Sequence, residues 1–253
     1  MDASTKPLLN KVPEVTLYFW IIKIMATTVG ETAADFLNFN LHLGLTKTSL
    51  LMGVLLIGAL ILQLWKRRYV PSIYWISVVF LSIFGTLITD NLSDNFGVAL
   101  TTTTAAFSIA LIATFAGWYA SEKTLSIHSI FTTRRELFYS LAILFTFALG
   151  TAAGDLVAER LGLGYGLSAL IFAGIIAVVA VAHYALKLNA IWAFWIAYIF
   201  TRPFGASCGD LLSQPVNNGG LGLGTVGTSV LFLVTVLALV SYLTVSKRDV
   251  ITI

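Results

Sequence analysis

The sequence predicts an all-α polytopic membrane protein, with eight transmembrane helices arranged as four parallel two-helix repeats. Three observations support this fold class: a low content of charge, a series of long apolar segments, and a repeated pattern of glycine and aspartate. Of the 253 residues, 58% are hydrophobic and 11% are charged, whereas a soluble domain has about 25% charged residues. This composition excludes an ordinary soluble enzyme and predicts a single membrane domain over residues 1–253.

Eight apolar segments are each long enough to cross a bilayer, which takes about 20 residues of helix. They lie at residues 16–37, 48–65, 72–91, 98–119, 136–157, 167–186, 190–212 and 225–244. The connections between them are short and leave no room for a soluble domain. Because backbone groups in lipid must bond to one another, we expect all eight segments to be α-helices.

The lysine and arginine residues predict the orientation. Eight spans place both termini on one side, and that side holds eleven of the fifteen Lys and Arg residues, Lys6 among them. The opposite side holds only Lys47 and Arg160, while Lys23 and Arg202 lie inside helices. Because loops rich in Lys and Arg stay in the cytoplasm, we expect both termini to be cytoplasmic.

A fourfold internal repeat links the odd-numbered segments, each of which has a glycine five residues before an aspartate. The pairs are Gly30 and Asp35, Gly85 and Asp90, Gly150 and Asp155, and Gly205 and Asp210. Trp20, Trp75 and Trp195 stand 15 residues before an aspartate, and Ser140 takes this place in the third repeat. The repeats span about 14–68, 69–123, 134–188 and 189–248. We expect the tryptophans to anchor the helices at the cytoplasmic membrane interface.

In these motifs the chain resembles a family of bacterial inner-membrane proteins built from four tandem two-helix repeats. The family is defined by a repeat of unknown function that has a characteristic tryptophan. The resemblance covers nearly the whole chain, and the third repeat departs from the pattern because it lacks the tryptophan. It implies the fold and a location in the bacterial inner membrane, and it implies no particular activity.

Polar residues at steps of four form one stripe along each odd-numbered helix. The stripe of the first helix holds Lys23, Thr27, Glu31 and Asp35, and the equivalent positions of the others include Thr86, Asp90, Thr151, Asp155, Arg202 and Asp210. We expect the stripes to converge on a central axis, with the four glycines allowing close approach of the helices. The acids outnumber the bases there, so carboxyl groups must be protonated or a cation must bind.

These residues predict a secondary transporter of a hard metal cation, such as Mn, Mg, Ca or a trivalent Al or Fe, with proton-coupled export as one mode. Hard cations prefer carboxylate and hydroxyl oxygens. The expected ligands or proton acceptors are Glu31, Asp35, Asp90, Asp155 and Asp210, with Thr27, Thr86 and Thr151 as helpers, and the expected metal ligands among them are Glu31, Asp35, Asp155 and Asp210. Lys23 and Arg202 are expected to be counter-ions that gate the site. His42, His128 and His183 are scattered and form no pair, which disfavours zinc and copper.

Other hypotheses remain open at this point. The aspartates could form the acidic ring of a cation channel, the substrate could be a small organic solute carried with protons, or Lys23 and Arg202 could bind an anion. The aspartates could also be end residues that bond the backbone of outer turns, and Lys23 and Glu31 could be a structural ion pair.

A membrane enzyme and a retinal protein attached to Lys23 are disfavoured by the absence of an Asp-Asp-x-x-Asp element and by the helix count. We therefore expect no enzymatic activity, no cofactor and no nucleic-acid partner. The expected partners are a metal cation, protons and the lipid bilayer, and the sequence leaves homo-oligomerisation open.

Overall fold

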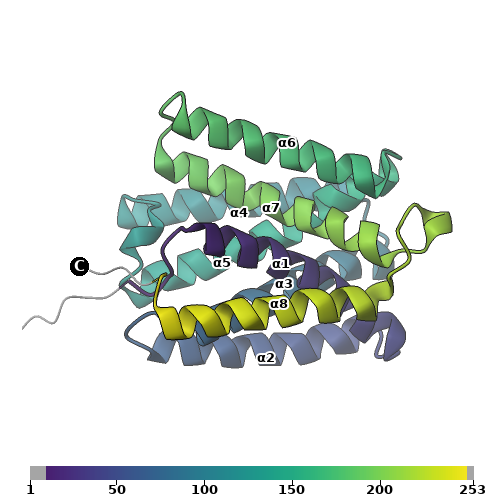
Figure 1. The fold of residues 1–253 in the computed structure, drawn as a ribbon, viewed down its shortest axis with the longest axis horizontal. Helices are drawn as coiled ribbons and strands as arrows, with labels where there is room; N and C mark the ends of the chain where they lie inside the picture. The colour runs from purple at the N-terminus through teal and green to yellow at the C-terminus, as the bar shows by residue number, and fades with distance from the viewer. Residues whose placement is uncertain (1–9, 250–253) are drawn as a thin grey trace, which may run out of the picture.

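The computed structural model describes residues 10–249, which form eight α-helices and no strand (Figure 1). The helices are α1 (Leu17–Asp35), α2 (Leu45–Trp65), α3 (Pro71–Asp90), α4 (Leu100–Glu122), α5 (Thr133–Asp155), α6 (Gly164–Tyr184), α7 (Ala190–Ser213) and α8 (Gly224–Ser246). Each of them overlaps one predicted segment, which confirms the all-α fold class. Lys6, one of the basic residues counted in the orientation argument, lies outside the described residues.

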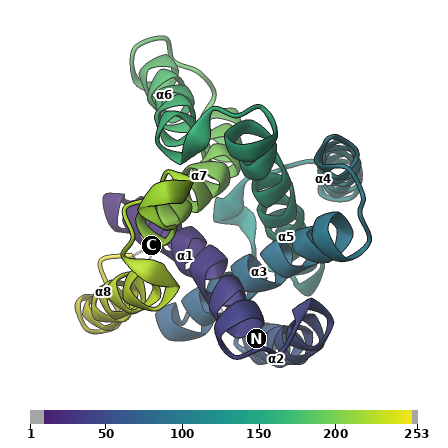
Figure 2. The ribbon, with the colours of Figure 1, turned by 90° about the vertical axis from the view of Figure 1, so that its right-hand side faces the viewer.

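The odd-numbered helices form an inner ring, and the even-numbered helices cover it from outside (Figure 2). Around the ring, α1 packs against α3, α3 against α5, α5 against α7, and α7 against α1. Each outer helix packs on the inner helix of the following repeat: α2 on α3, α4 on α5, α6 on α7, and α8 on α1. The last of these contacts joins the end of the chain to its beginning, so the four repeats form one closed ring.

The repeated glycines lie where neighbouring inner helices touch. The contacts are Gly30 with Ser82, Gly85 with Phe147, Gly150 with Arg202, and Gly205 with Thr27. Each partner stands three residues before the glycine of its own helix, so the same contact recurs four times around the ring. A Cβ added to Gly85 would lie 2.6 Å from the Cβ of Phe147 and 3.1 Å from the backbone nitrogen of Ala148. The expected close approach of the helix backbones is therefore confirmed.

Six helices of the described part are long and apolar enough to cross a membrane, as in a multi-pass membrane protein. They are α2, α3, α4, α5, α6 and α8. The remaining two, α1 and α7, belong to the inner ring and carry the most polar stripes. Lys23 on α1 and Arg202 on α7 are fully buried within the protein, so these charges lower the apolar content of their helices without facing lipid.

A π-helical turn follows the aspartate in three of the four repeats within residues 10–249. The turns are Phe36–Asn40 after Asp35, Asn91–Asn95 after Asp90, and Leu156–Arg160 after Asp155. In the fourth repeat α7 continues as an α-helix past Asp210 to Ser213. Such turns are rare and occur often at functional sites, which draws attention to the aspartate end of the ring.

Aromatic side chains fill the opposite end of the ring. Trp75 and Trp195 are 2% and 3% exposed and lie in the hydrophobic core. The prediction that the repeat tryptophans are interface anchors is wrong for these two, because their inner helices turn the indoles into the protein. Trp118 of α4, in the second repeat, packs edge-on against Tyr139 of the third repeat, with ring centroids 6.4 Å apart. Trp118 thereby fills the core next to the position that lacks a tryptophan.

The segments that flank the first and last helices cross this aromatic end. Lys11 forms a buried ion pair with Glu136 at the start of α5 and donates a hydrogen bond to the backbone oxygen of Leu64 at 3.1 Å. The hydroxyl of Tyr69 donates to the carboxylate of Asp249 at 2.5 Å. Contacts from the two ends of the described chain thus hold several repeats together at this end of the ring.

Candidate functional site

The polar stripes meet on the axis of the ring, one helical turn before the aspartates. Equivalent positions of the four repeats hold Glu31, Thr86, Thr151 and Ala206. The first three of these side chains contact one group, the guanidinium of Arg202. Residues four apart share a face of an α-helix, so four parallel helices that turn this face inward bring the stripes to one line. The expected convergence of the stripes is observed at this level.

Arg202 is fully buried and fills the axis at this level. Its Nη2 lies 2.6 Å from Oε2 of Glu31 and 2.6 Å from Oγ1 of Thr151, and it also contacts the hydroxyl of Thr86. Its Nη1 donates to the backbone oxygen of Thr27 at 3.0 Å. A buried guanidinium needs both a counter-charge and hydrogen-bond acceptors, and the three other inner helices supply them.

Three of the predicted acidic residues gather beside this ion pair. Carboxylate oxygens of Glu31, Asp155 and Asp210 all lie within 4.8 Å of one another. Glu31 and Asp210 are buried and Asp155 is half-buried. Of these three acids only Glu31 forms an ion pair within the described residues, with Arg202, so the cluster has an excess of negative charge when the acids are ionised. Oxygen ligands that converge from three helices are the donor set that a hard cation prefers.

The other two predicted acids, Asp35 and Asp90, are half-buried and belong to no such group among the described residues. Three of the four predicted metal ligands therefore lie close together, and the fourth, Asp35, lies apart from them.

None of the four repeat aspartates makes a side-chain hydrogen bond within residues 10–249, where every side-chain bond of the aspartates involves Asp94 or Asp249. The hypothesis that they bond the backbone of outer turns thus gains no support from the structure.

The three predicted helper threonines have different roles in packing. The hydroxyls of Thr86 and Thr151 lie 3.4 Å apart on the axis and both contact Arg202. The hydroxyl of Thr27 instead donates to the backbone oxygen of Ile24 at 2.6 Å, within α1. Thr27 contacts the axial arginine through its backbone oxygen, so its side chain serves the contact between α1 and α7.

Lys23 is separate from the carboxylates. Its Nζ lies 4.3 Å from the ring centroids of both Phe147 and Tyr198, and it makes no hydrogen bond within the described part of the chain. The hypothesis of a direct Lys23–Glu31 pair is wrong, because Glu31 pairs with Arg202. The two rings that enclose Lys23 were not singled out from the sequence. In the repeat register Phe147 is equivalent to Thr27 and Tyr198 is equivalent to Lys23. This equivalence is the sequence signal that could have identified them.

A family model described as a Repeat of Unknown Function (DUF347) matches the chain four times, at residues 18–69, 73–124, 138–189 and 193–249. The chain belongs to this family. The four tandem matches confirm the predicted organisation into four repeats, and they agree with the closed ring of four helix pairs. No curated protein and no solved structure matches the chain. Membership in the DUF347 family leaves the activity to be argued from the residues on the axis.

Proposed function

We propose that this DUF347 protein is a secondary transporter that moves a hard metal cation along the axis of its helical ring. The observation that carries the proposal is the group formed by Glu31, Asp155 and Asp210, whose carboxylate oxygens lie within 4.8 Å of one another. Ionisable residues inside a membrane are costly, and they mark ion and proton pathways where they occur. Mn²⁺, Mg²⁺, Ca²⁺ and the trivalent ions Al³⁺ and Fe³⁺ are the candidate substrates.

The proposal includes eight transmembrane helices, with both termini in the cytoplasm of a bacterium and the chain in its inner membrane. The inner helices α1 and α7 have 19 and 24 residues, and they pack in a closed ring with α3 and α5, which are apolar enough to span. The basic loops favour a cytoplasmic location for the aromatic end. The aspartate end then faces the periplasm.

In this mechanism Arg202 is an internal cation that balances Glu31 while the site is empty. A metal ion that binds Glu31, Asp155 and Asp210 supplies positive charge of its own and weakens the hold of Glu31 on the guanidinium. Protons that bind the carboxyl groups offer a second way to neutralise them, which couples metal release to proton uptake. Asp35 and Asp90 line the path at the aspartate end, and the positive charge of Lys23 hinders passage of a cation at the aromatic end.

The position of Arg202 argues against the alternative of an open channel. Its guanidinium is fully buried on the axis and bonds α1, α3 and α5 at once. A cation channel with an acidic ring needs a continuous path of low energy for the ion. A fixed positive charge across that path fits a transporter that changes conformation better than a pore.

The proposal is tested with purified protein in detergent and a panel of Mn²⁺, Mg²⁺, Ca²⁺, Al³⁺ and Fe³⁺. A ligand that binds only the folded state raises its stability, by about 2.7 kcal/mol at 100 times the dissociation constant. We expect one cation to raise the melting temperature of the wild type and of Asp94→Asn, which changes an exposed acid outside the group. The same cation should have little effect on Asp155→Asn or Asp210→Asn.

Transport is then measured in proteoliposomes that enclose a fluorescent sensor for that metal. Uptake by the wild type that is lost in Asp155→Asn supports the proposal. A pH-dependent shift that no metal alters, and that Asp155→Asn abolishes, would favour a proton-coupled organic solute instead. The proposal is contradicted if every metal shifts the wild type and Asp155→Asn equally.

A further inference from the structure

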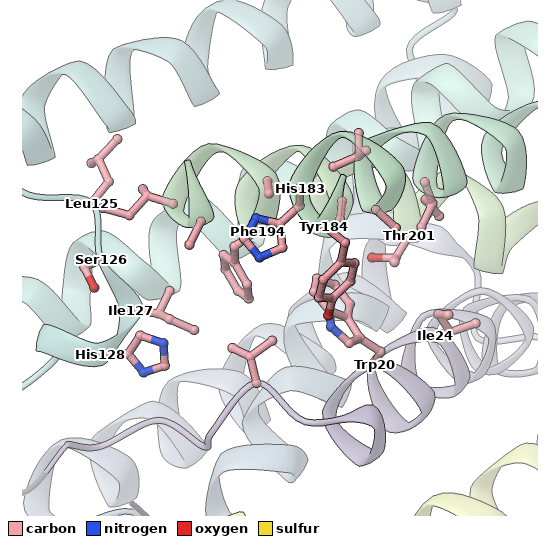
Figure 3. Close-up of a pocket in the computed structure, with 18 residues that line it drawn as sticks. Trp20, Ile24, Leu125, Ser126, Ile127, His128, His183, Tyr184, Phe194 and Thr201 are labelled. Carbon is pink, nitrogen blue, oxygen red and sulfur yellow. The ribbon is translucent and has the colours of Figure 1, made fainter. Parts of the chain in front are cut away.

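A cavity of about 420 Å³ lies beside the ring, between α1, α6, α7 and the segment that joins α4 to α5 (Figure 3). It runs from Leu125 and His128 near the aromatic end to Ile24 of α1 and Thr201 of α7. Pockets that bind small organic molecules have volumes of about 300–1,000 Å³. The cavity is therefore large enough for a molecule with a ring system, and it is separate from the carboxylates on the axis.

The walls of the cavity are mostly apolar, and the polar side chains among them are Ser126, His128, His183, Tyr184 and Thr201. Aromatic rings of Trp20, Tyr184 and Phe194 surround it (Figure 3), together with aliphatic side chains of the same helices. None of the described residues that line it is Lys, Arg, Asp or Glu. A metal cation would find no carboxylate here, and an anionic or phosphate-bearing headgroup would find no fixed positive charge.

Among the polar side chains of the lining, the ring of His183 is held in place by a hydrogen bond. The Nδ1 of His183 lies 2.8 Å from the backbone oxygen of Leu188. A carbonyl oxygen only accepts hydrogen bonds, so Nδ1 is the donor here, and a ring that carries this single N–H presents Nε2 as an acceptor. No hydrogen bond to this Nε2 occurs within residues 10–249. The hydroxyl of Thr201, another polar group of the lining, already donates to the backbone oxygen of Tyr198 at 2.7 Å.

We propose that this cavity binds a neutral organic molecule with an apolar ring body and one N–H or O–H group. This group would donate a hydrogen bond to Nε2 of His183. Apolar walls with a few placed polar groups are typical of such sites, because the walls supply affinity and the polar group sets orientation. The site is independent of the cation site on the axis. It reaches the axis only through chain neighbours, since Ile24 follows Lys23 and Thr201 precedes Arg202.

The test uses 2-naphthol, which has a ring body and one O–H donor, and 2-methoxynaphthalene, which has the same rings and no donor. Binding is measured as the rise in melting temperature of the purified protein with increasing probe. Ala197→Phe fills the cavity from α7, and Ala180→Phe fills it from α6. Ala106→Phe, on the exposed face of α4, is the matched control for a new aromatic ring at the protein surface.

We expect 2-naphthol to stabilise the wild type and Ala106→Phe to a saturating extent, and to have no such effect on the two filled variants. The methoxy probe should bind the wild type about two- to tenfold more weakly, as for the loss of one neutral hydrogen bond. His183→Phe should bind the two probes alike. At least one of the two filled variants must melt at the wild-type temperature without probe. Its failure to bind the probe is then not caused by misfolding.

The proposal is overturned if 2-naphthol gives no saturable shift, or if the filled variants respond as Ala106→Phe does. Displacement of 2-naphthol by phosphatidylethanolamine would assign the cavity to a lipid chain and would also overturn it. Neither result touches the cation proposal, because the metal panel reports on Asp155 and Asp210 and can be repeated with the filled variants.

Discussion

Replacing Glu31 with Gln removes the charge that balances Arg202. Glu31 supplies the only carboxylate within ion-pair distance of Arg202 among the described residues, at 2.6 Å. Gln keeps the length of the side chain and one acceptor oxygen, but it is neutral. Because Arg202 is fully buried, its charge would then be left in a medium that solvates it poorly.

The expected loss of stability is large. Removing one partner of a buried ion pair costs about 3–5 kcal/mol. A protein of this size shifts its melting temperature by about 2–4 °C per kcal/mol, which gives a fall of about 6–20 °C. Asp155 and Asp210 lie close enough to Glu31 to balance part of the charge, so we expect the lower half of this range. Asp155→Asn removes an acid without a basic partner of its own and should not lower the melting temperature.

The assay is thermal unfolding in detergent and chelator for the wild type, Glu31→Gln, Arg202→Met and the double variant. The double variant leaves neither charge buried without its partner, so it should recover about 0.5–3 kcal/mol relative to the sum of the single losses. Glu122→Gln is the control, because it breaks the partly exposed pair with Arg135, and its shift should be far smaller. A Glu31→Gln protein that melts within about 2 °C of the wild type would refute the reasoning.

Three further predictions concern other parts of the ring. Lys23→Met should raise stability by about 1 kcal/mol, since it removes an unbonded buried amine and keeps contacts with two rings; a loss of that size in thermal unfolding would contradict this. Gly85→Ala should cost about 1–3 kcal/mol because its Cβ meets Phe147, whereas Gly58→Ala, which meets nothing within 4 Å, should gain about 0.5–1 kcal/mol; equal melting temperatures would refute the contact. Burial raises the pKa of Asp249, after α8, above its ordinary 3.8 even though Tyr69 donates a hydrogen bond to it. The folded protein then holds this proton more tightly than the unfolded chain, so stability falls as the pH rises from 3.8 through the raised pKa; Asp249→Asn should remove that fall from a pH series of melting curves.

The convergence of the odd-numbered helices on one axis could be predicted from the sequence because the repeats are parallel, whereas the closed ring could not. Identical positions in parallel repeats meet at the same level, so the glycine and aspartate of each odd-numbered helix predict where the helices touch. The structure places Gly85 against α5 and Gly150 against α7 in the same way. The convergence of Glu31, Thr86 and Thr151 follows from the same register.

The partners of individual side chains could not be predicted in this way. Whether Lys23 or Arg202 pairs with Glu31 depends on how far each side chain reaches across the axis, and the register alone does not contain that information. The burial of Trp75 and Trp195 was missed because the preference of tryptophan for membrane interfaces is an average over positions, and an inner helix overrides it. The cavity beside His183 depends on segments that are distant in sequence, since α6 and α7 meet there with α1 and the loop before α5.

The four repeats differ in the side chains that meet on the axis and agree in their glycines and aspartates. One turn before the glutamate level, equivalent positions hold Thr27, Ser82, Phe147 and Arg202. Only one guanidinium fits there, because one fully buried arginine already uses the acceptors of three helices and a second would repel it. The glycines are the same in all four repeats because a Cβ at each of these positions would collide with the neighbouring inner helix. The aspartates are also the same, yet none makes a side-chain hydrogen bond within residues 10–249. Packing therefore gives no reason for four aspartates at this level, whereas the proposed binding of cations or protons would give one.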